Sequence, residues 1–133
     1  MEINRIIDWH NDPLSAELGV INLVDVPFPV RRIYWISYFK SGAVRGNHAH
    51  KNLTQLMIPI AGSLDLVLYN GVDSETIRLS AGDEPVVIKP GMWRVMKNAS
   101  ENSVVMVLAS EVYVESDYIR DWNQYLDWHE AQK

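Results

Sequence analysis

Residues 42–62 read Gly-Ala-Val-Arg-Gly-Asn-His-Ala-His-Lys-Asn-Leu-Thr-Gln-Leu-Met-Ile-Pro-Ile-Ala-Gly. Two histidines in this stretch, His48 and His50, are separated by a single residue. In a β-strand the side chains of residues i and i+2 point to the same face, so we expect the two imidazoles to lie side by side. Converging imidazoles can bind a metal ion or share proton transfers near neutral pH. Taken alone, the pair is equally compatible with two solvent-exposed side chains.

The sequence on both sides of this stretch consists of short apolar, β-branched segments separated by turn residues. The predicted strands are Val20–Val24, Arg32–Phe39, Val44–His50, Thr54–Ala61, Ser63–Tyr69, Ser74–Leu79, Pro85–Ile88, Trp93–Asn98 and Val104–Ser110. Such closely spaced strands joined by short turns favour an antiparallel sandwich or barrel. We therefore expect an all-β fold with a barrel over about residues 20–110.

The C-terminal segment has a different pattern. Apolar residues at Ile119, Trp122, Tyr125 and Leu126 fall on one helical stripe, and Ser116 is a suitable N-cap. This predicts a short amphipathic helix over about residues 116–132, packed on the outside of the barrel or on a partner chain. We expect residues 1–133 to form a single domain.

The composition restricts the classes of function. The chain has 133 residues, of which 47% are hydrophobic and 22% charged, which is typical of a globular domain. It contains no cysteine, which excludes disulfides, thiolate zinc sites and a cysteine nucleophile. The net charge of −5 makes binding to nucleic acid or an anionic membrane unexpected, although a local basic pocket for one phosphorylated ligand is compatible with it. Without a signal-length or membrane-spanning apolar run, we expect a soluble, cytoplasmic protein.

The spacing around the histidine pair resembles the first signature of the cupin family. That signature consists of a glycine, His-x-His, a glutamate and a second glycine, and Gly42, His48, His50 and Gly62 have the matching spacing. Gln55 stands where the signature has glutamate. The resemblance implies a single cupin domain, which is an antiparallel jelly-roll β-barrel.

The second cupin signature is matched in its interval by Gly91, Arg94 and Asn98, with Arg94 in the place of a histidine. The metal site of such cupins uses three histidines and a carboxylate, so two of the four ligands are replaced here. Gln55 is a neutral and weak ligand, whereas Arg94 is cationic and has no lone pair to offer. Because two imidazoles are too few for a stable site, we expect no metal and no cofactor.

Histidines that bind no metal are natural general acids or bases near neutral pH. Arg32 and Tyr34 share one face of their predicted strand, and Arg45 precedes the histidine strand. We expect these side chains to line a cavity that holds the two histidines. Arginines there can bind phosphoryl oxygens, and aromatic rings can stack on a base or sugar. One of the two aromatic residues Tyr34 and Trp35 could instead pack in the core and have no role in ligand binding.

Longer segments are similar to the TDP-4-keto-6-deoxyglucose 3,4-ketoisomerases. These segments are 32–36, 44–51, 62–63, 90–93, 108–110 and 115–121, and the similarity extends from about Ile21 to Trp128. The resemblance implies a metal-free enzyme that moves the ketone of a TDP-linked 4-keto-6-deoxy sugar from C4 to C3 through an enediol. It also implies a role in making 3-amino-3,6-dideoxy sugars of bacterial surface glycans, and a homodimer with an exchanged N-terminal segment.

Within this hypothesis the catalytic residues are His48, His50 and Tyr34. His48 transfers the carbon-bound proton and His50 shuttles a proton between the two oxygens, although these two roles could be exchanged. Tyr34 is a candidate hydrogen-bond donor to the developing enolate oxygen. The predicted substrate-binding residues are Arg32, Arg45, Arg94, Gln55 and Trp93.

Three other functions are alternatives to this one. A non-catalytic cupin module could bind a nucleotide sugar without turning it over. A metal-dependent cupin is disfavoured by Gln55 and Arg94. A sugar epimerase of the same fold uses a His–Asp relay, for which the sequence suggests no aspartate.

Overall fold

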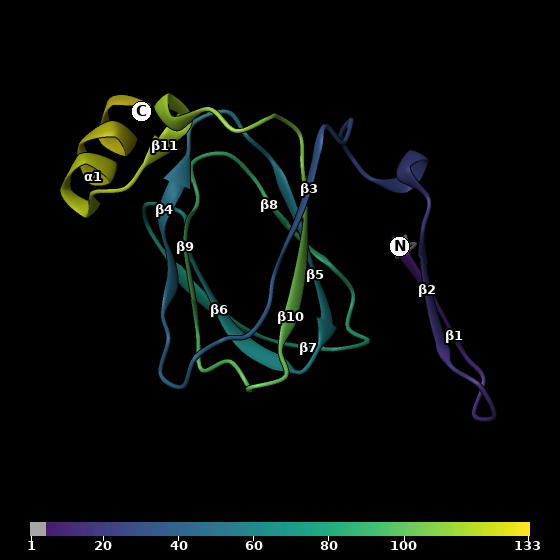
Figure 1. Cartoon of the computed structure of the whole chain (residues 1–133). Helices are drawn as coiled ribbons and strands as arrows, with labels where there is room; N and C mark the ends of the chain where they lie inside the picture. The colour runs from purple at the N-terminus through teal and green to yellow at the C-terminus, as the bar shows by residue number, and fades with distance from the viewer. Residues whose placement is uncertain (1–4) are drawn as a thin grey trace.

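A computed structural model describes residues 5–133 of the chain, which form two facing β-sheets with additional elements on their outer sides (Figure 1). The strands are β1 (Ile7–Asn11), β2 (Glu17–Ile21), β3 (Arg32–Ile36), β4 (Arg45–His50), β5 (Gln55–Ala61), β6 (Ser63–Tyr69), β7 (Ser74–Ser80), β8 (Val86–Ile88), β9 (Trp93–Lys97), β10 (Val104–Ala109) and β11 (Tyr118–Ile119). The helices are α1 (Trp122–Ala131) and the 3-10 turns η1 (Leu23–Asp25) and η2 (Glu115–Asp117).

The strand pairing is antiparallel throughout the described residues. One sheet has the order β3-β10-β5-β8 and the other the order β11-β4-β9-β6-β7, while β1 and β2 form a separate hairpin. The predicted all-β architecture is confirmed. The predicted strand Arg32–Phe39 ends earlier, at Ile36, because Tyr38 has a left-handed backbone conformation with φ +58°. The later predicted strands agree with those observed to within one residue at each end, and β6 agrees at both ends.

The N-terminal strand differs from the prediction. The expected strand Val20–Val24 is displaced toward the N-terminus as β2, and Leu23–Asp25 form the turn η1. The segment Ile7–Asn11, which was not predicted as a strand, pairs with β2. This hairpin lies on the side of the barrel opposite α1 (Figure 1).

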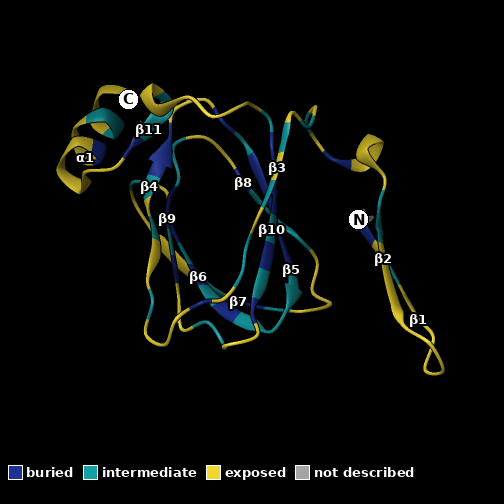
Figure 2. Ribbon diagram, viewed as in Figure 1, coloured by how far each residue is buried: buried dark blue, intermediate teal, exposed yellow. Residues whose placement is uncertain are grey.

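The main core lies between the two sheets, where alternate residues of each strand meet. Leu64, Leu66 and Leu68 of β6 point inward and pack against Val105 and Val107 of β10 in one buried cluster. Burying each such side chain contributes about 1.5–3 kcal/mol. Figure 2 shows that buried residues concentrate in the two sheets, whereas most of the hairpin and of α1 is exposed.

The helix α1 covers the outer face of β4 and β9. Tyr125 is fully buried there with Trp93 and Ala49, and its hydroxyl donates to the carbonyl oxygen of Gly91 at 2.7 Å. The helix begins at Trp122, because the side chain of Asp121 caps it by accepting from the backbone N–H of Gln124 at 2.9 Å. No helix among the described residues has the length and apolar character needed to cross a bilayer.

The predicted start of this helix at Ser116 is therefore wrong. Ser116 lies in η2, and Ile119 lies in β11, where it pairs with Ala49 of β4. Of the predicted apolar stripe, only Tyr125 is buried within the helix, while Trp122 and Leu126 remain 42% and 37% exposed. Pairing with β4 holds residues 118–119 extended, so the helix cannot begin before them.

Candidate active site

The histidine pair lies inside the barrel. In β4 the side chain of Ala49 packs outward beneath α1, so its neighbours His48 and His50 point inward. Their ring centroids are 4.9 Å apart and the ring planes are nearly perpendicular, at 88°. The predicted shared face is confirmed, with His50 fully buried and His48 partly buried.

A β-bulge in β4 orients the ring of His48. The register shifts between Gly46 and His48, where Gly46 has φ +90° and Asn47 has φ +53°. The carbonyl oxygen of Gly46 then lies 3.1 Å from Nδ1 of His48. Because a carbonyl only accepts, Nδ1 carries the hydrogen and Nε2 keeps its lone pair.

His48 is neutral at physiological pH. Burial, together with the nearby charge of the Arg94 guanidinium, lowers the pKa of His48 to about 4. The hydrogen bond to the carbonyl of Gly46 opposes this shift without cancelling it. The free Nε2 is therefore able to accept a proton from a ligand.

His50 is held by an aspartate far away in the sequence. Its Nδ1 lies 3.1 Å from Oδ2 of Asp117, whose Oδ1 accepts from the backbone N–H of Asn52 at 2.7 Å. The expectation that no aspartate is placed for a His–Asp pair is thus wrong. Burial, Arg94 and His48 outweigh the carboxylate and hold the pKa of His50 below its usual value. Its Nε2 is buried and has no hydrogen-bond partner among the described residues.

Arg94, Gln55 and Tyr34 form a chain of hydrogen bonds beside the histidines. Arg94 lies opposite His48 on β9 and is 1% exposed, yet burial lowers its pKa only to about 10, so it stays charged. Its Nη1 donates to Oε1 of Gln55 and its Nη2 to the carbonyl of Met92 at 3.2 Å. Nε2 of Gln55 in turn donates to the Tyr34 hydroxyl oxygen at 2.8 Å. The two residues that replace cupin ligands therefore bond to each other.

A cavity of about 320 Å³ lies next to His48. Its lining includes the aromatic rings of Tyr34 and Tyr118 and three arginines, Arg32, Arg45 and Arg120. The Tyr118 ring is 5.0 Å from that of His48 and 4.3 Å from that of His50. The cavity is therefore lined by a neutral imidazole that can exchange protons and by three positively charged side chains.

The structure places most of the predicted site residues together. His48, Tyr34, Arg32 and Arg45 line the cavity, whereas the fully or almost fully buried His50, Gln55 and Arg94 lie behind this lining. Trp93 does not belong to this group. It points to the opposite face of β9 from Arg94 and packs against Tyr125 beneath α1, with ring centroids 5.3 Å apart.

Sequence reasoning missed three residues of the site: Asp117, Tyr118 and Arg120. All three lie in the segment 115–121, which carries part of the family resemblance but whose own pattern predicts the start of a helix. Arg120 is held by a two-pronged ion pair with Glu115 at 2.8 and 2.9 Å, and its guanidinium lies 4.1 Å from the centre of the Tyr118 ring. Over residues 5–133, no three histidine, aspartate or glutamate side chains are grouped so that they could hold a metal ion. A metal-free site stays a prediction.

Comparison with known proteins identifies the family. A family model described as "FdtA: WxcM-like, C-terminal" matches residues 1–130. The chain belongs to this family. A curated relative, the TDP-4-oxo-6-deoxy-alpha-D-glucose-3,4-oxoisomerase of Aneurinibacillus thermoaerophilus, is 36% identical over 124 residues, which cover 92% of this chain and 89% of the relative.

Solved structures of 3,4-ketoisomerases match the fold over nearly its whole length. QdtA of Thermoanaerobacterium thermosaccharolyticum, in complex with TDP, has a TM-score of 0.88 and 32% identity over 96% of this chain and 93% of its own. A 3,4-ketoisomerase from Helicobacter canadensis has a TM-score of 0.86 and 38% identity, covering 93% of both chains. A variant of QdtA was solved with TDP-4-keto-6-deoxyglucose. The predicted membership among TDP-4-keto-6-deoxyglucose 3,4-ketoisomerases, with their cupin-like fold, is confirmed.

Proposed function

We propose that this chain is an isomerase that converts TDP-4-keto-6-deoxyglucose into a TDP-3-keto-6-deoxyhexose. The observation that carries the proposal is the state of His48, a neutral imidazole with a free Nε2 beside a basic cavity. The names of the relatives agree with this activity. A non-catalytic module that only binds a nucleotide sugar is less well supported, because the relatives are named as enzymes.

The reaction requires only proton movements. The C3–H of the substrate is acidic because it lies next to the C4 carbonyl, and its removal gives an enediolate. Protonation at C4, with one proton passed from the C3 oxygen to the C4 oxygen, gives the 3-keto product with no net oxidation. General acid–base catalysis contributes about 10²–10⁴-fold for each well-placed group.

The geometry supports specific roles for three side chains. Nε2 of His48 accepts the C3 proton and returns a proton to C4, since His48 is the histidine that lines the cavity. His50, whose ring centroid is 4.9 Å from that of His48, is assigned the proton transfer between the oxygens, which requires that substrate binding opens access to its buried Nε2. Tyr34 lines the same cavity and donates a hydrogen bond to the enolate oxygen.

The diphosphate of the nucleotide is assigned to Arg32 and Arg45. Among the described residues, neither guanidinium has a carboxylate within salt-bridge distance, whereas Arg120 is paired with Glu115. The guanidinium of Arg32 also lies 4.8 Å from the centre of the Tyr34 ring. Arginines bind phosphoryl oxygens through two parallel N–H donors, which suits this position.

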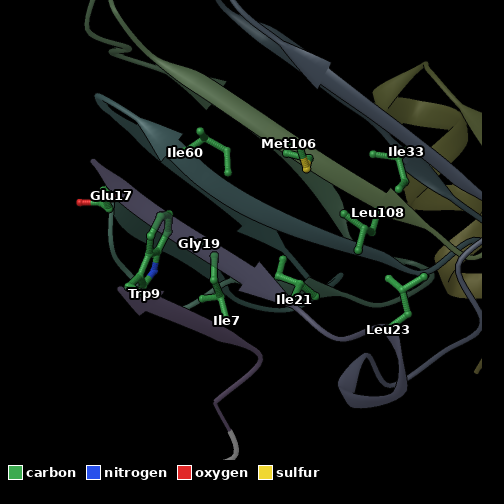
Figure 3. Close-up of a pocket in the computed structure, with 10 residues that line it drawn as sticks. All are labelled: Ile7, Trp9, Glu17, Gly19, Ile21, Leu23, Ile33, Ile60, Met106 and Leu108. Atoms are coloured by element: carbon green, nitrogen blue, oxygen red, sulfur yellow. The ribbon is translucent and has the colours of Figure 1, made fainter. Parts of the chain in front are cut away.

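A homodimer with an exchanged N-terminal segment is part of the proposal. A largely apolar cavity of about 540 Å³ lies between the β1–β2 hairpin and the outer face of the β3-β10-β5-β8 sheet (Figure 3). Its lining includes Trp9 from the hairpin and Ile33, which is 51% exposed, from β3. Sedimentation velocity of the purified chain tests the dimer, and a monomer at micromolar concentration would contradict it.

A cytoplasmic location and a product destined for lipopolysaccharide or S-layer glycans are further parts of the proposal.

Isomerisation is tested by incubating the protein with TDP-4-keto-6-deoxyglucose in deuterated buffer and following the sugar by NMR. We expect deuterium at C4 and loss of the C3 proton. Deuterium at C5 would indicate an epimerase instead, a relevant alternative now that His50 has an aspartate partner. Binding without any exchange would favour the non-catalytic module.

A further inference from the structure

We propose that Gln55 is a positioning residue for catalysis, because its amide directs the hydroxyl hydrogen of Tyr34 into the cavity beside His48. The catalytic consequence rests on the proposed ketoisomerase function. The direction of the hydrogen bond follows from the geometry of the site alone.

Arg94 determines which end of the Gln55 amide faces Tyr34. A guanidinium can only donate hydrogen bonds, and Nη1 of Arg94 bonds to Oε1 of Gln55. The carbonyl end of the amide therefore faces Arg94 and the NH2 end faces Tyr34. Arg94 and Gln55 are buried, with 1% and 2% of their surfaces exposed, so the packing of the barrel maintains this orientation of the amide.

The NH2 group in turn determines where the Tyr34 hydrogen points. Nε2 of Gln55 lies 2.8 Å from the Tyr34 hydroxyl oxygen and can only donate to it. The hydroxyl hydrogen must then point away from Gln55, and Tyr34 has no other hydrogen-bond partner among the described residues. Tyr34 lines the same cavity as His48, so its hydrogen is available to a ligand oxygen there. Burial raises the pKa of Tyr34, so the hydroxyl keeps its hydrogen at neutral pH.

A glutamate at position 55 would reverse this arrangement. Its carboxylate would accept from both neighbours, forming an ion pair with Arg94 and drawing the Tyr34 hydrogen away from the cavity. Residue 55 would still form a hydrogen bond with Arg94 and another with Tyr34, so the barrel would keep these contacts. The hydrogen that Tyr34 donates to the substrate would be lost. A merely structural role for Gln55 and a positioning role therefore predict opposite outcomes for Gln55→Glu.

The experiment measures Gln55→Glu in the wild-type background and in a Tyr34→Phe background. The assays contain EDTA, because the new carboxylate lies near two histidines. We expect kcat to fall about 10²-fold in the wild-type background, the loss typical of one donor to a developing oxyanion, with KM within about 3-fold. In the Tyr34→Phe background we expect no further loss, and the melting temperature should not fall in either.

Three results would overturn the inference: an unchanged kcat, an equal loss in both backgrounds, or a Gln55→Glu protein that does not fold despite the ion pair available to it. A readout independent of turnover is the titration of Tyr34 by NMR of tyrosine labelled at Cζ, with Tyr34→Phe identifying the signal. The pKa of Tyr34 should rise in Gln55→Glu, because a carboxylate acceptor favours the protonated phenol. An unchanged titration refutes the hydrogen-bond direction, whereas a wild-type protein without turnover refutes only the proposed function.

Discussion

Replacing Asp117 by asparagine should reverse one hydrogen bond of His50 while leaving the surrounding backbone in place. Oδ1 of Asp117 accepts from the N–H of Asn52 at 2.7 Å, and Oδ2 lies 3.1 Å from Nδ1 of His50. In Asp117→Asn the carbonyl oxygen keeps the contact with Asn52, so the NH2 group faces the imidazole. Nδ1 must then act as acceptor, and the ring hydrogen moves to Nε2.

The change in tautomer sets the magnitude of the effect. With a hydrogen on Nε2, neutral His50 can no longer accept a proton from a sugar oxygen. The contribution of one acid–base group is about 10²–10⁴-fold, and the same Asp-to-Asn exchange in serine protease triads costs about 10⁴-fold in kcat. We expect a loss of kcat within this range. Because one hydrogen bond is replaced by another, the free energy of unfolding should fall by only about 1–2 kcal/mol.

The assay is kcat measured by NMR of the TDP-sugar, together with thermal unfolding of the same samples. Asp121→Asn is the matched control, since Asp121 makes the same kind of contact to a backbone N–H but caps α1 at the surface. Asparagine caps a helix as well as aspartate does, so this variant should keep kcat within about 2-fold and stability within about 0.5 kcal/mol. A folded Asp117→Asn protein with kcat within about 3-fold of the wild type would refute the assigned role of His50.

Three further outcomes are expected. His48→Asn should lower kcat by at least about 10²-fold while TDP binding, measured by calorimetry, stays unchanged; normal turnover would refute the role of His48. Thermal stability should fall as the pH drops from 6.5 to 4, because over this range His48 becomes protonated in the unfolded chain but not in the folded chain, where its pKa is about 4. An equally steep pH dependence in His48→Asn would contradict this. Gly46→Ala should destabilise the fold more than Gly42→Ala, by calorimetric melting: both glycines have positive φ, but only at Gly46 does a Cβ lie 2.8 Å from the carbonyl oxygen of Arg94. Equal losses would show that backbone conformation alone sets the cost.

The strands between Arg32 and Ala109 could be predicted because each carries its own local pattern. Alternation of apolar and polar residues, interrupted by turn residues, specifies both a strand and its inward face. The same rule placed His48 and His50 on one face before any tertiary contact was known. The same rule also predicts that Trp93 lies outside the site, since neighbours in a strand point to opposite faces and Arg94 points inward.

The elements that sequence reasoning missed depend on partners rather than on local pattern. β11 consists of Tyr118 and Ile119 alone, and it is a strand only because it pairs with Ala49 and His50. β1 and β2 pair with each other in a hairpin, and the alternation in β1 is too short to predict a strand, because it contains only two apolar residues, Ile7 and Trp9. Segments this short have weak intrinsic preference, so their neighbours decide their conformation.

Contacts between distant residues were unpredictable for the same reason, and the one between Arg94 and Gln55 changes how the two replacements are interpreted. Considered separately, each residue removes a metal ligand. In the folded barrel they depend on each other, because a buried guanidinium needs acceptors and the side chain of Gln55 supplies one of them. Together with burial, the charge of Arg94 holds the pKa of His48 low. The side chain that would repel a cation from this barrel therefore also keeps its imidazoles neutral and ready to accept protons.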